Sequence, residues 1–299
     1  RACQVRQRAA GSEERLGDPK GASVLSRRAS DEDPSDVIAL EALARLYASS
    51  SNDEKLAEVL LRRMEADPDV ETRVELGQRL AQLYETQLDR PHDAIDVFVR
   101  VLEMDPQNTP SVTGLGRLYE RQAMWPELLD NLKLRAGLAE SSTDRVALIH
   151  RAGAVTEREL DDVLEALVLY QQVLDIDNRH EPSLQALVRI SHLDDYRLQA
   201  AEILEPLLHV HERWDLLADL KKLKADAATD PFDKKAELSA LAQVRESGLQ
   251  DTQGAFDAYA AAFAEDPADE DIAEHLERLA AMTDGYGRLA DELSTRAGG

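Results

Sequence analysis

Two histidines, His209 and His211, have residue types and a spacing that first suggest chemistry. They lie close in sequence to Glu205 and Glu212, and imidazole and carboxylate groups are common metal ligands. Ligands on one helix share a face when they are three or four residues apart, whereas side chains two residues apart diverge. Because the surrounding apolar pattern is helical, we predict no metal site here.

Other features with catalytic potential have simpler explanations. Gly-Leu-Gly at 114–116 resembles the start of a nucleotide-binding loop, but the third glycine is missing and no strand precedes it. The acidic pairs at 161–162 and 194–195 fall between expected helices, where aspartate caps a helix. Cys3 lies among arginines but has no implied histidine partner. We therefore expect no catalytic site, no cofactor and no bound metal.

Charge excludes several classes of partner. The chain has 299 residues, with 59 acidic against 35 basic side chains and a net charge of −24. Such a surface repels nucleic acid and anionic membranes, and aromatic residues, at 4%, are too few for a base-stacking surface. A well-solvated surface explains the acidic excess, and attraction of a basic protein partner is the alternative.

Cysteine content and hydropathy narrow the class further. A single cysteine precludes an internal disulfide. No run of about 18 apolar residues predicts a membrane-spanning helix, so we expect no membrane insertion. The sequence opens at Arg1 without a charged and then apolar leader, which favours a cytoplasmic location.

An internal repeat organises the chain. Ala22, Ala94 and Ala166 are spaced by 72 residues, and many other positions recur at the same interval. A further copy follows after 89 residues, so that Ala166 corresponds to Ala255. The additional 17 residues are about the length of one helix.

The elements within each copy are predicted to be helices. Apolar residues lie three and four apart, as in Leu40, Leu43 and Tyr47, and prolines at the breaks suit the first turn of a helix. No alternating pattern predicts a strand. We expect helices over residues 1–15, 19–32, 36–49, 53–66, 70–87, 91–104, 110–122, 126–139, 144–160, 163–176, 182–194, 197–211, 213–228, 233–248, 252–265, 269–282 and 286–296.

Such helices must stack, because a short hairpin cannot bury both of its apolar stripes alone. The predicted fold is therefore an all-α solenoid of antiparallel hairpins, forming one domain over residues 1–299. Its expected parts are a partial unit at 1–34, double hairpins at 35–106 and 107–178, a double hairpin with an extra helix at 179–267, and a partial hairpin at 268–299. The extra helix, either 183–193 or 198–211, predicts an irregularity, a kink or a division, between residues 182 and 230.

The helix pairs resemble the tetratricopeptide-repeat family. That family places Leu, a small residue and an aromatic on the first helix, here Leu43, Ala44 and Tyr47. The second helix carries a small residue and an aromatic, here Ala94 and Phe98. The small residue lets helices approach closely, and the aromatic fills the gap between hairpins. The resemblance covers nearly the whole chain and implies binding of protein or peptide partners.

The resemblance also implies that the first helices line a concave binding face. The residues it places there are Glu41, Arg45, Gln78, Gln82, Glu85, Thr113, Arg117, Glu120, His150, Glu157, Gln185, Arg189, His192, Gln243, Glu246 and Arg278. Two ladders of charge recur within this set. The basic ladder is Arg45, Arg117, Arg189 and Arg278, and the acidic one is Glu13, Glu85, Glu157 and Glu246.

Two interpretations of the ladders stay open. In one, the guanidinium groups make bidentate contacts with ligand carboxylates, and in the other Arg and Glu pair between neighbouring helices. The favoured function is an interaction scaffold for protein partners. The alternative is self-assembly through uncapped solenoid ends into a larger complex or filament. An enzyme with a site in the groove would need a metal or cofactor that copurifies.

Overall fold

The computed structural model describes residue 33 and residues 35–282, and all regular elements in that part of the chain are helical. The α-helices are α3 (Val37–Ser49), α4 (Asp53–Ala66), α5 (Val70–Thr86), α6 (Pro91–Met104), α7 (Thr109–Arg121), α8 (Trp125–Leu138), α9 (Ser142–Arg158), α10 (Val163–Ile176), α11 (Glu181–Ser191), α12 (Arg197–Val210), α13 (Trp214–Ala227), α14 (Pro231–Gln243), α15 (Thr252–Glu265) and α16 (Glu270–Met282). A 3-10 turn, η1 (Asp194–Tyr196), precedes α12, and a π-helical turn, η2 (Val244–Gly248), follows α14. The helices expected at 1–15, 19–32 and 286–296, together with Cys3 and Glu13, lie outside the described residues.

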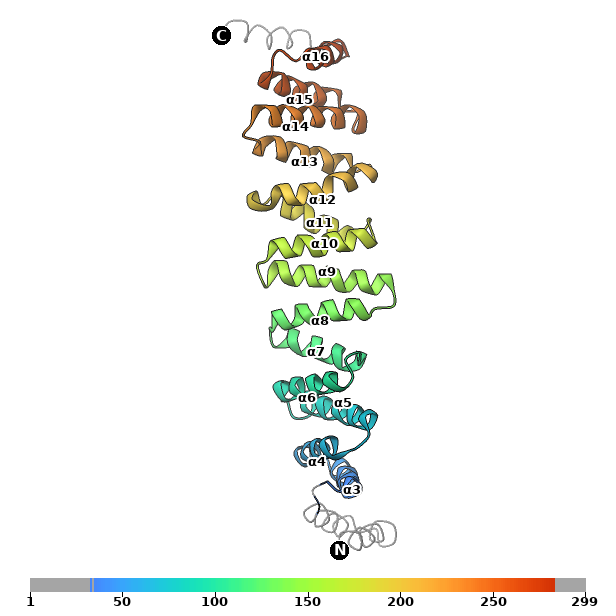
Figure 1. Cartoon of the computed structure of the whole chain (residues 1–299). Coiled ribbons are helices and arrows are strands. Elements are labelled where there is room, and N and C mark those ends of the chain that lie inside the picture. Colours follow the sequence, from blue (N-terminus) through green and yellow to red (C-terminus); the bar gives the residue numbers. More distant parts are fainter. Residues whose placement is uncertain (1–32, 34, 283–299) are drawn as a thin grey trace. The chain divides into compact units, whose positions relative to one another are not determined.

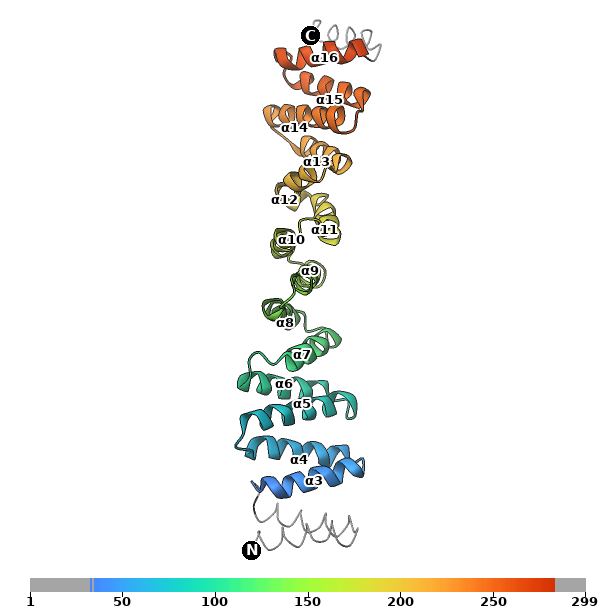
Figure 2. The same cartoon turned by 90° about the vertical axis from the view of Figure 1, so that its right-hand side faces the viewer.

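The helices form two compact units, one ending at Leu148 and the other beginning at Ile149, so the division falls within α9. From α3 to α8 in the first unit, and from α10 to α16 in the second, each helix packs against the next one along the chain (Figures 1 and 2). Each unit is therefore an all-α solenoid of stacked hairpins, which confirms the predicted fold class. The repeat boundaries at 34, 106, 178 and 267 stay a prediction.

Local chemistry explains where the helices begin. The side chains of Asp36, Asn52, Asp69 and Asn108 each accept a hydrogen bond from a backbone N–H in the first turn of the following helix. Proline lies in the first turn of α6, α7, α8, α11 and α14, where its missing N–H leaves no bond unmade. The expected single helix at 233–248 is instead α14 followed by the wider turn η2.

The repeat also governs the backbone of the turns. The non-glycine residues with positive φ are Ser51, Ala123, Glu212, Asp89, Asp161 and Gln250. The first three are related by shifts of 72 and then 89 residues, and so are the last three. Because a left-handed residue other than glycine costs about 1 kcal/mol, this recurrence shows that the packing of the hairpins imposes the turn geometry.

The core consists of residues that the repeat places between helices. Phe98 and Tyr170, which are equivalent by the 72-residue shift, are 5% and 1% exposed. A Cβ added to Gly114 would lie 2.7 Å from the ring of Phe98, and one added to Gly153 would lie 2.8 Å from the ring of Tyr170. These rings therefore pack directly on the helix backbone, as the family resemblance implies.

The expected irregularity between residues 182 and 230 is local. α12 follows α8 by 72 residues and α13 follows it by 89, so this stretch holds one helix more than the regular repeat. Helices α10 to α14 still pack in sequence, because α12 buries Ala200, Leu204 and Leu208, so the expected division of the solenoid is wrong. The irregular features are η1, in place of a left-handed turn, and Pro206 inside α12.

Candidate functional site

The predicted concave-face residues lie on alternate helices. They belong to α3, α5, α7, α9 and α11, and then to α14, η2 and α16. The change from odd-numbered to even-numbered helices reflects the extra helix between α11 and α14. All of these residues are exposed or half-buried, so each is accessible to a partner.

Three Glu–Arg pairs connect alternate helices at a constant separation of 32 residues. Arg117 Nε donates to Glu85 Oε1 at 2.7 Å, and Arg117 Nη2 donates to Glu85 Oε2 at 2.5 Å. Arg189 contacts both oxygens of Glu157 at 2.8 to 3.1 Å. Arg278 contacts both oxygens of Glu246 at 2.6 and 2.9 Å. The structure therefore pairs the two ladders with each other.

The fourth ladder position behaves differently. Arg45 lies 3.6 Å from Glu41 in the same helix, and its side chain is 64% exposed. The residue 32 positions before it is Glu13, which lies outside the described residues. Glu41 also contacts Arg63 of α4 at 3.6 Å, so these are longer and weaker contacts than the three bidentate pairs.

The bidentate pairs are asymmetric in exposure. The side chains of Glu85 and Glu157 are 8% and 12% exposed, whereas those of Arg117 and Arg189 are 58% and 50% exposed. The hydrogen bond to Glu85 raises the pKa of the Arg117 guanidinium above its ordinary value. Each glutamate thus fixes a guanidinium whose remaining N–H donors take no part in the pair.

A second contact recurs at the start of the same helices, with different chemistry in each unit. Gln78 Nε2 donates to Asn108 Oδ1 at 2.7 Å. The positions 72 residues later are His150 and His180, and the Nδ1 atoms of both lie 2.9 Å from the hydroxyl of the buried Ser183. A hydroxyl has one hydrogen, so it donates to one imidazole and accepts from the other.

Burial and neighbouring charge alter the ionisation of this cluster. Burial, followed by the nearby His180, lowers the pKa of His150. Burial also raises the pKa of the Tyr170 hydroxyl, which donates to Glu157 Oε2 at 2.7 Å. Glu157 therefore has two partners, Tyr170 and Arg189, whereas the position of Tyr170 in the first unit is occupied by Phe98.

The other predicted residues are separate exposed positions. Gln82, Thr113 and Glu120 are exposed on α5 and α7, and His192 is exposed just after α11. Gln185 Nε2 donates to Glu181 Oε1 at 3.2 Å within α11. Gln243 lines a cavity that the sequence analysis did not predict.

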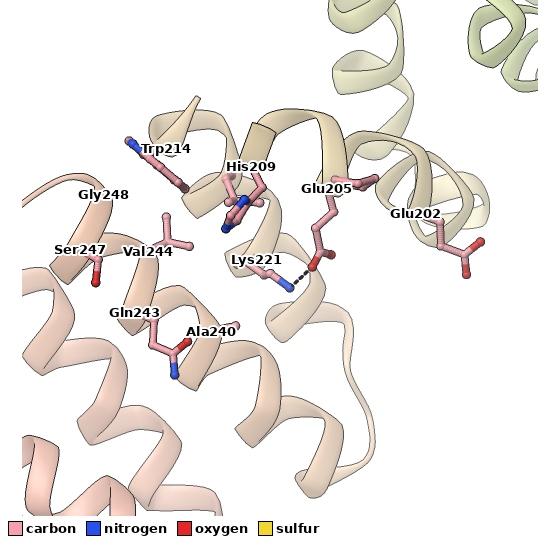
Figure 3. A pocket seen from close by; sticks show the side chains of 12 residues that line it. Glu202, Glu205, His209, Trp214, Lys221, Ala240, Gln243, Val244, Ser247 and Gly248 are labelled. Atoms are coloured by element: carbon pink, nitrogen blue, oxygen red, sulfur yellow. Dashed lines mark hydrogen bonds and ion pairs between the residues drawn. The ribbon is translucent and has the colours of Figure 1, made fainter. Parts of the chain in front are cut away.

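That cavity has a volume of about 690 Å³ and lies among α12, α13, α14 and η2 (Figure 3). Trp214, Leu217 and Val244 contribute apolar surface, while Glu205 and Lys221 contribute charge. The signals that could have located it are the 17-residue insertion and Pro206, which disturbs an otherwise helical pattern.

Metal-binding and membrane-spanning features were also sought in the described part of the chain. Those residues contain no group of three or more His, Cys, Asp or Glu side chains placed to hold a metal ion. His209 instead packs edge-on against Trp214, and His211 Nε2 donates to the carbonyl of Asn178 at 2.9 Å. Among helices within residues 35–282, none combines the length and apolar character needed to cross a bilayer.

Comparison with known proteins agrees with the repeat pattern. Residues 39–74, from α3 to the start of α5, match the family described as Tetratricopeptide repeat. The chain is similar to the crystal structure of YrrB, a TPR protein with an unusual peptide-binding site, at 17% identity and a TM-score of 0.36 over 62% of this chain and 91% of that one. It is also similar to the MamA protein, at 16% identity and a TM-score of 0.36 over 60% of this chain and 92% of that one. No curated protein matches the chain.

The family match and the tandem hairpins together identify the class of protein. The chain is a helical-hairpin array of the tetratricopeptide-repeat type, which confirms the resemblance predicted from its sequence. Tetratricopeptide-repeat proteins are generally protein-interaction scaffolds, and their fold is typically non-catalytic.

Proposed function

We propose that this chain is a non-catalytic scaffold that binds a protein or peptide partner through the face formed by its Glu–Arg pairs. The observation that carries the proposal is the recurrence of a fixed, half-exposed guanidinium at one register. A side chain that is already held in place loses little conformational entropy when a ligand binds. This pre-organisation favours recognition over a purely structural role.

The chemistry of this face suits peptide groups. The N–H donors of Arg117 and Arg189 outside each pair can donate to partner carbonyl or carboxylate oxygens. Thr113 and Gln185 lie exposed one helical turn before these arginines and supply neutral donors and acceptors. Affinity then comes from a few oriented contacts within each unit.

The test compares capture of partners by three forms of the protein. The parent, the variant Arg117→Ala with Arg189→Ala, and the control Arg90→Ala with Arg100→Ala are immobilised and exposed to the soluble proteins of the source cell. Arg90 and Arg100 form ion pairs of similar exposure with Glu54 and Glu65, on the other set of helices. Bound proteins are identified by mass spectrometry, and the dissociation constant of each purified partner is then measured.

We expect a partner that the parent and the control retain and that the Arg117 and Arg189 variant loses, with affinity about tenfold weaker or more. Equal capture by all three forms would show that the Glu–Arg face is structural and that any scaffold surface lies elsewhere.

A further inference from the structure

Two cavities lie along one face of α13, between α12 and α14. The first, of about 690 Å³, lies at the start of α13, and the second, of about 630 Å³, lies at its end. From α13 they are lined by Trp214, Leu217, Lys221, Lys224 and Ala228, all three or four residues apart and therefore on one face. Because α13 has 14 residues, the cavities together form a groove about 21 Å long.

A cluster of four charges separates the two cavities. Lys221 and Lys224 on α13 each contact Glu205 on α12 and Glu237 on α14. Burial opposes ionisation of Glu205, but hydrogen bonds from Lys221 and Lys224 outweigh it and lower the pKa of this carboxyl. Both lysines are therefore already neutralised by carboxylates of the groove walls.

The first cavity has an apolar interior that its neighbours hold open. Trp214 packs against Gly248 of η2 so closely that a Cβ on that glycine would lie 2.5 Å from the indole. His209 meets the same indole edge-on, with ring centroids 5.3 Å apart. Figure 3 shows Trp214, His209 and Val244 around the same space. A π-helical turn and a proline within a helix both break regular packing, which explains why the cavity forms here.

The charges that line the groove leave an acidic excess. Its basic residues are Arg197, Lys221 and Lys224, and each is paired with a carboxylate of the groove. Glu202 on α12 and Asp233 on α14 line the first and second cavities, respectively, and their carboxylates form no ion pair with the described residues. A ligand that complements this groove is therefore apolar at its centre and positively charged beside these two carboxylates.

We propose that the groove over α13 binds a basic amphipathic segment of a partner protein. Its apolar side chains enter the two cavities, and its Lys or Arg side chains pair with Glu202 and Asp233. The acidic groove excludes nucleic acid, and its length of about 21 Å matches a helix of about 14 residues lying along α13. This site is distinct from the Glu–Arg face and does not depend on the function proposed for that face.

The test uses random peptides of about 14 residues displayed on phage and selected on the purified chain. Selected peptides are synthesised and titrated against three forms of the protein. These are the parent, a variant with Glu202→Lys and Asp233→Lys, and a control with Asp219→Lys and Asp226→Lys. The control carries the same change of charge on exposed residues of α13 that do not line the groove.

We expect the selected peptides to combine Lys or Arg with apolar residues at helical spacing. Their affinity should fall about tenfold or more in the Glu202 and Asp233 variant and stay near the parent value in the control. Peptides that are acidic, equal loss in both variants, or no recovered binder would overturn the proposal.

A second measurement locates the bound peptide. Trp214 and Trp125 are the tryptophans of the chain, so in a Trp125→Phe background the fluorescence reports on the groove alone. The proposal expects the peptide to shift the Trp214 emission with the same concentration dependence as binding. Unchanged emission contradicts it. A shift that appears with rising protein concentration and no peptide identifies a second copy as the occupant, which also contradicts it.

Discussion

The junction of α5, α6 and α7 and the junction of α9, α10 and α11 are built on the same plan 72 residues apart. Each has a bidentate Glu–Arg pair and an aromatic ring packed on a helix glycine. They differ in three places. Phe98 is replaced by Tyr170, Gln78 by His150, and Asn108 by His180.

The difference shows what the repeat constrains. It constrains the size and position of side chains, because neighbouring hairpins must pack at the same distance in each copy. It leaves the chemistry of the polar contacts open. The second junction therefore gains a hydroxyl that supports Glu157 and a pair of titratable rings, while its backbone keeps the same plan.

The largest expected effect comes from removing the ring that fills the junction. Tyr170→Ala should destabilise the α9–α11 region by about 3–5 kcal/mol, as should Phe98→Ala in the α5–α7 region, because each leaves a cavity. Tyr170→Phe should cost only about 1 kcal/mol, since it removes one hydrogen bond and restores the ring of the first junction. Amide hydrogen exchange of the two regions measures each effect separately, and equal costs for the two Tyr170 variants would contradict this explanation.

Adding one methyl group against either ring should have the next largest effect. Gly153→Ala and Gly114→Ala each place a Cβ within 3 Å of an aromatic ring, so both should cost about 1–3 kcal/mol. Gly137→Ala is the control, because nothing lies within 4 Å of its Cβ, and it should stabilise α8 by about 0.5–1 kcal/mol. Urea denaturation followed by circular dichroism checks all three, and a destabilised Gly137 variant would contradict the packing argument.

Loss of the ladder arginines should distinguish the two junctions by a smaller amount. Arg117→Ala leaves Glu85 nearly buried without its bidentate partner, whereas after Arg189→Ala the carboxylate of Glu157 keeps the Tyr170 hydroxyl. We expect the Arg117 variant to lose about 1 kcal/mol more than the Arg189 variant. Hydrogen exchange of α5 and α9 measures this difference, and it should vanish when Tyr170→Phe is added.

The smallest expected effect is a dependence on pH in the second junction alone. Because the pKa of His150 is lowered in the folded protein, the unfolded chain takes up its proton first, near its ordinary value of 6.5. Stability of the α9–α11 region should therefore fall as the pH drops below about 6.5 and stay constant just above it. The α5–α7 region, with Gln78 and Asn108, lacks this response.

A double variant isolates that response. His150→Gln with His180→Asn reproduces the amide pair of the first junction and should make the pH dependence of hydrogen exchange the same in both. Background changes from Glu157, Arg158 and Arg189, which act on His150, remain present in the variant. Persistence of the pH dependence would show that the imidazoles do not cause it.

Much of the fold could be predicted from the sequence. Apolar spacing, prolines and capping residues specify helices locally, so the predicted ranges within residues 35–282 agree with α3 to α16 to within a few residues. The 72-residue recurrence identified the stacked hairpins, and the shift to 89 residues located the extra helix. The expected division was wrong because α12 has its own buried apolar face, which lets the stack continue.

Less of the candidate sites could be predicted. The sequence by itself determined the helices, the repeat and the register that places Arg117 and Glu85 on alternate helices. Only the tertiary structure decided that these residues pair, that His150 and His180 share Ser183, and that a groove opens over α13. Local sequence patterns set which face of a helix is apolar. Contacts between residues about 30 positions apart depend instead on how closely whole helices pack, and one inserted helix changes that packing.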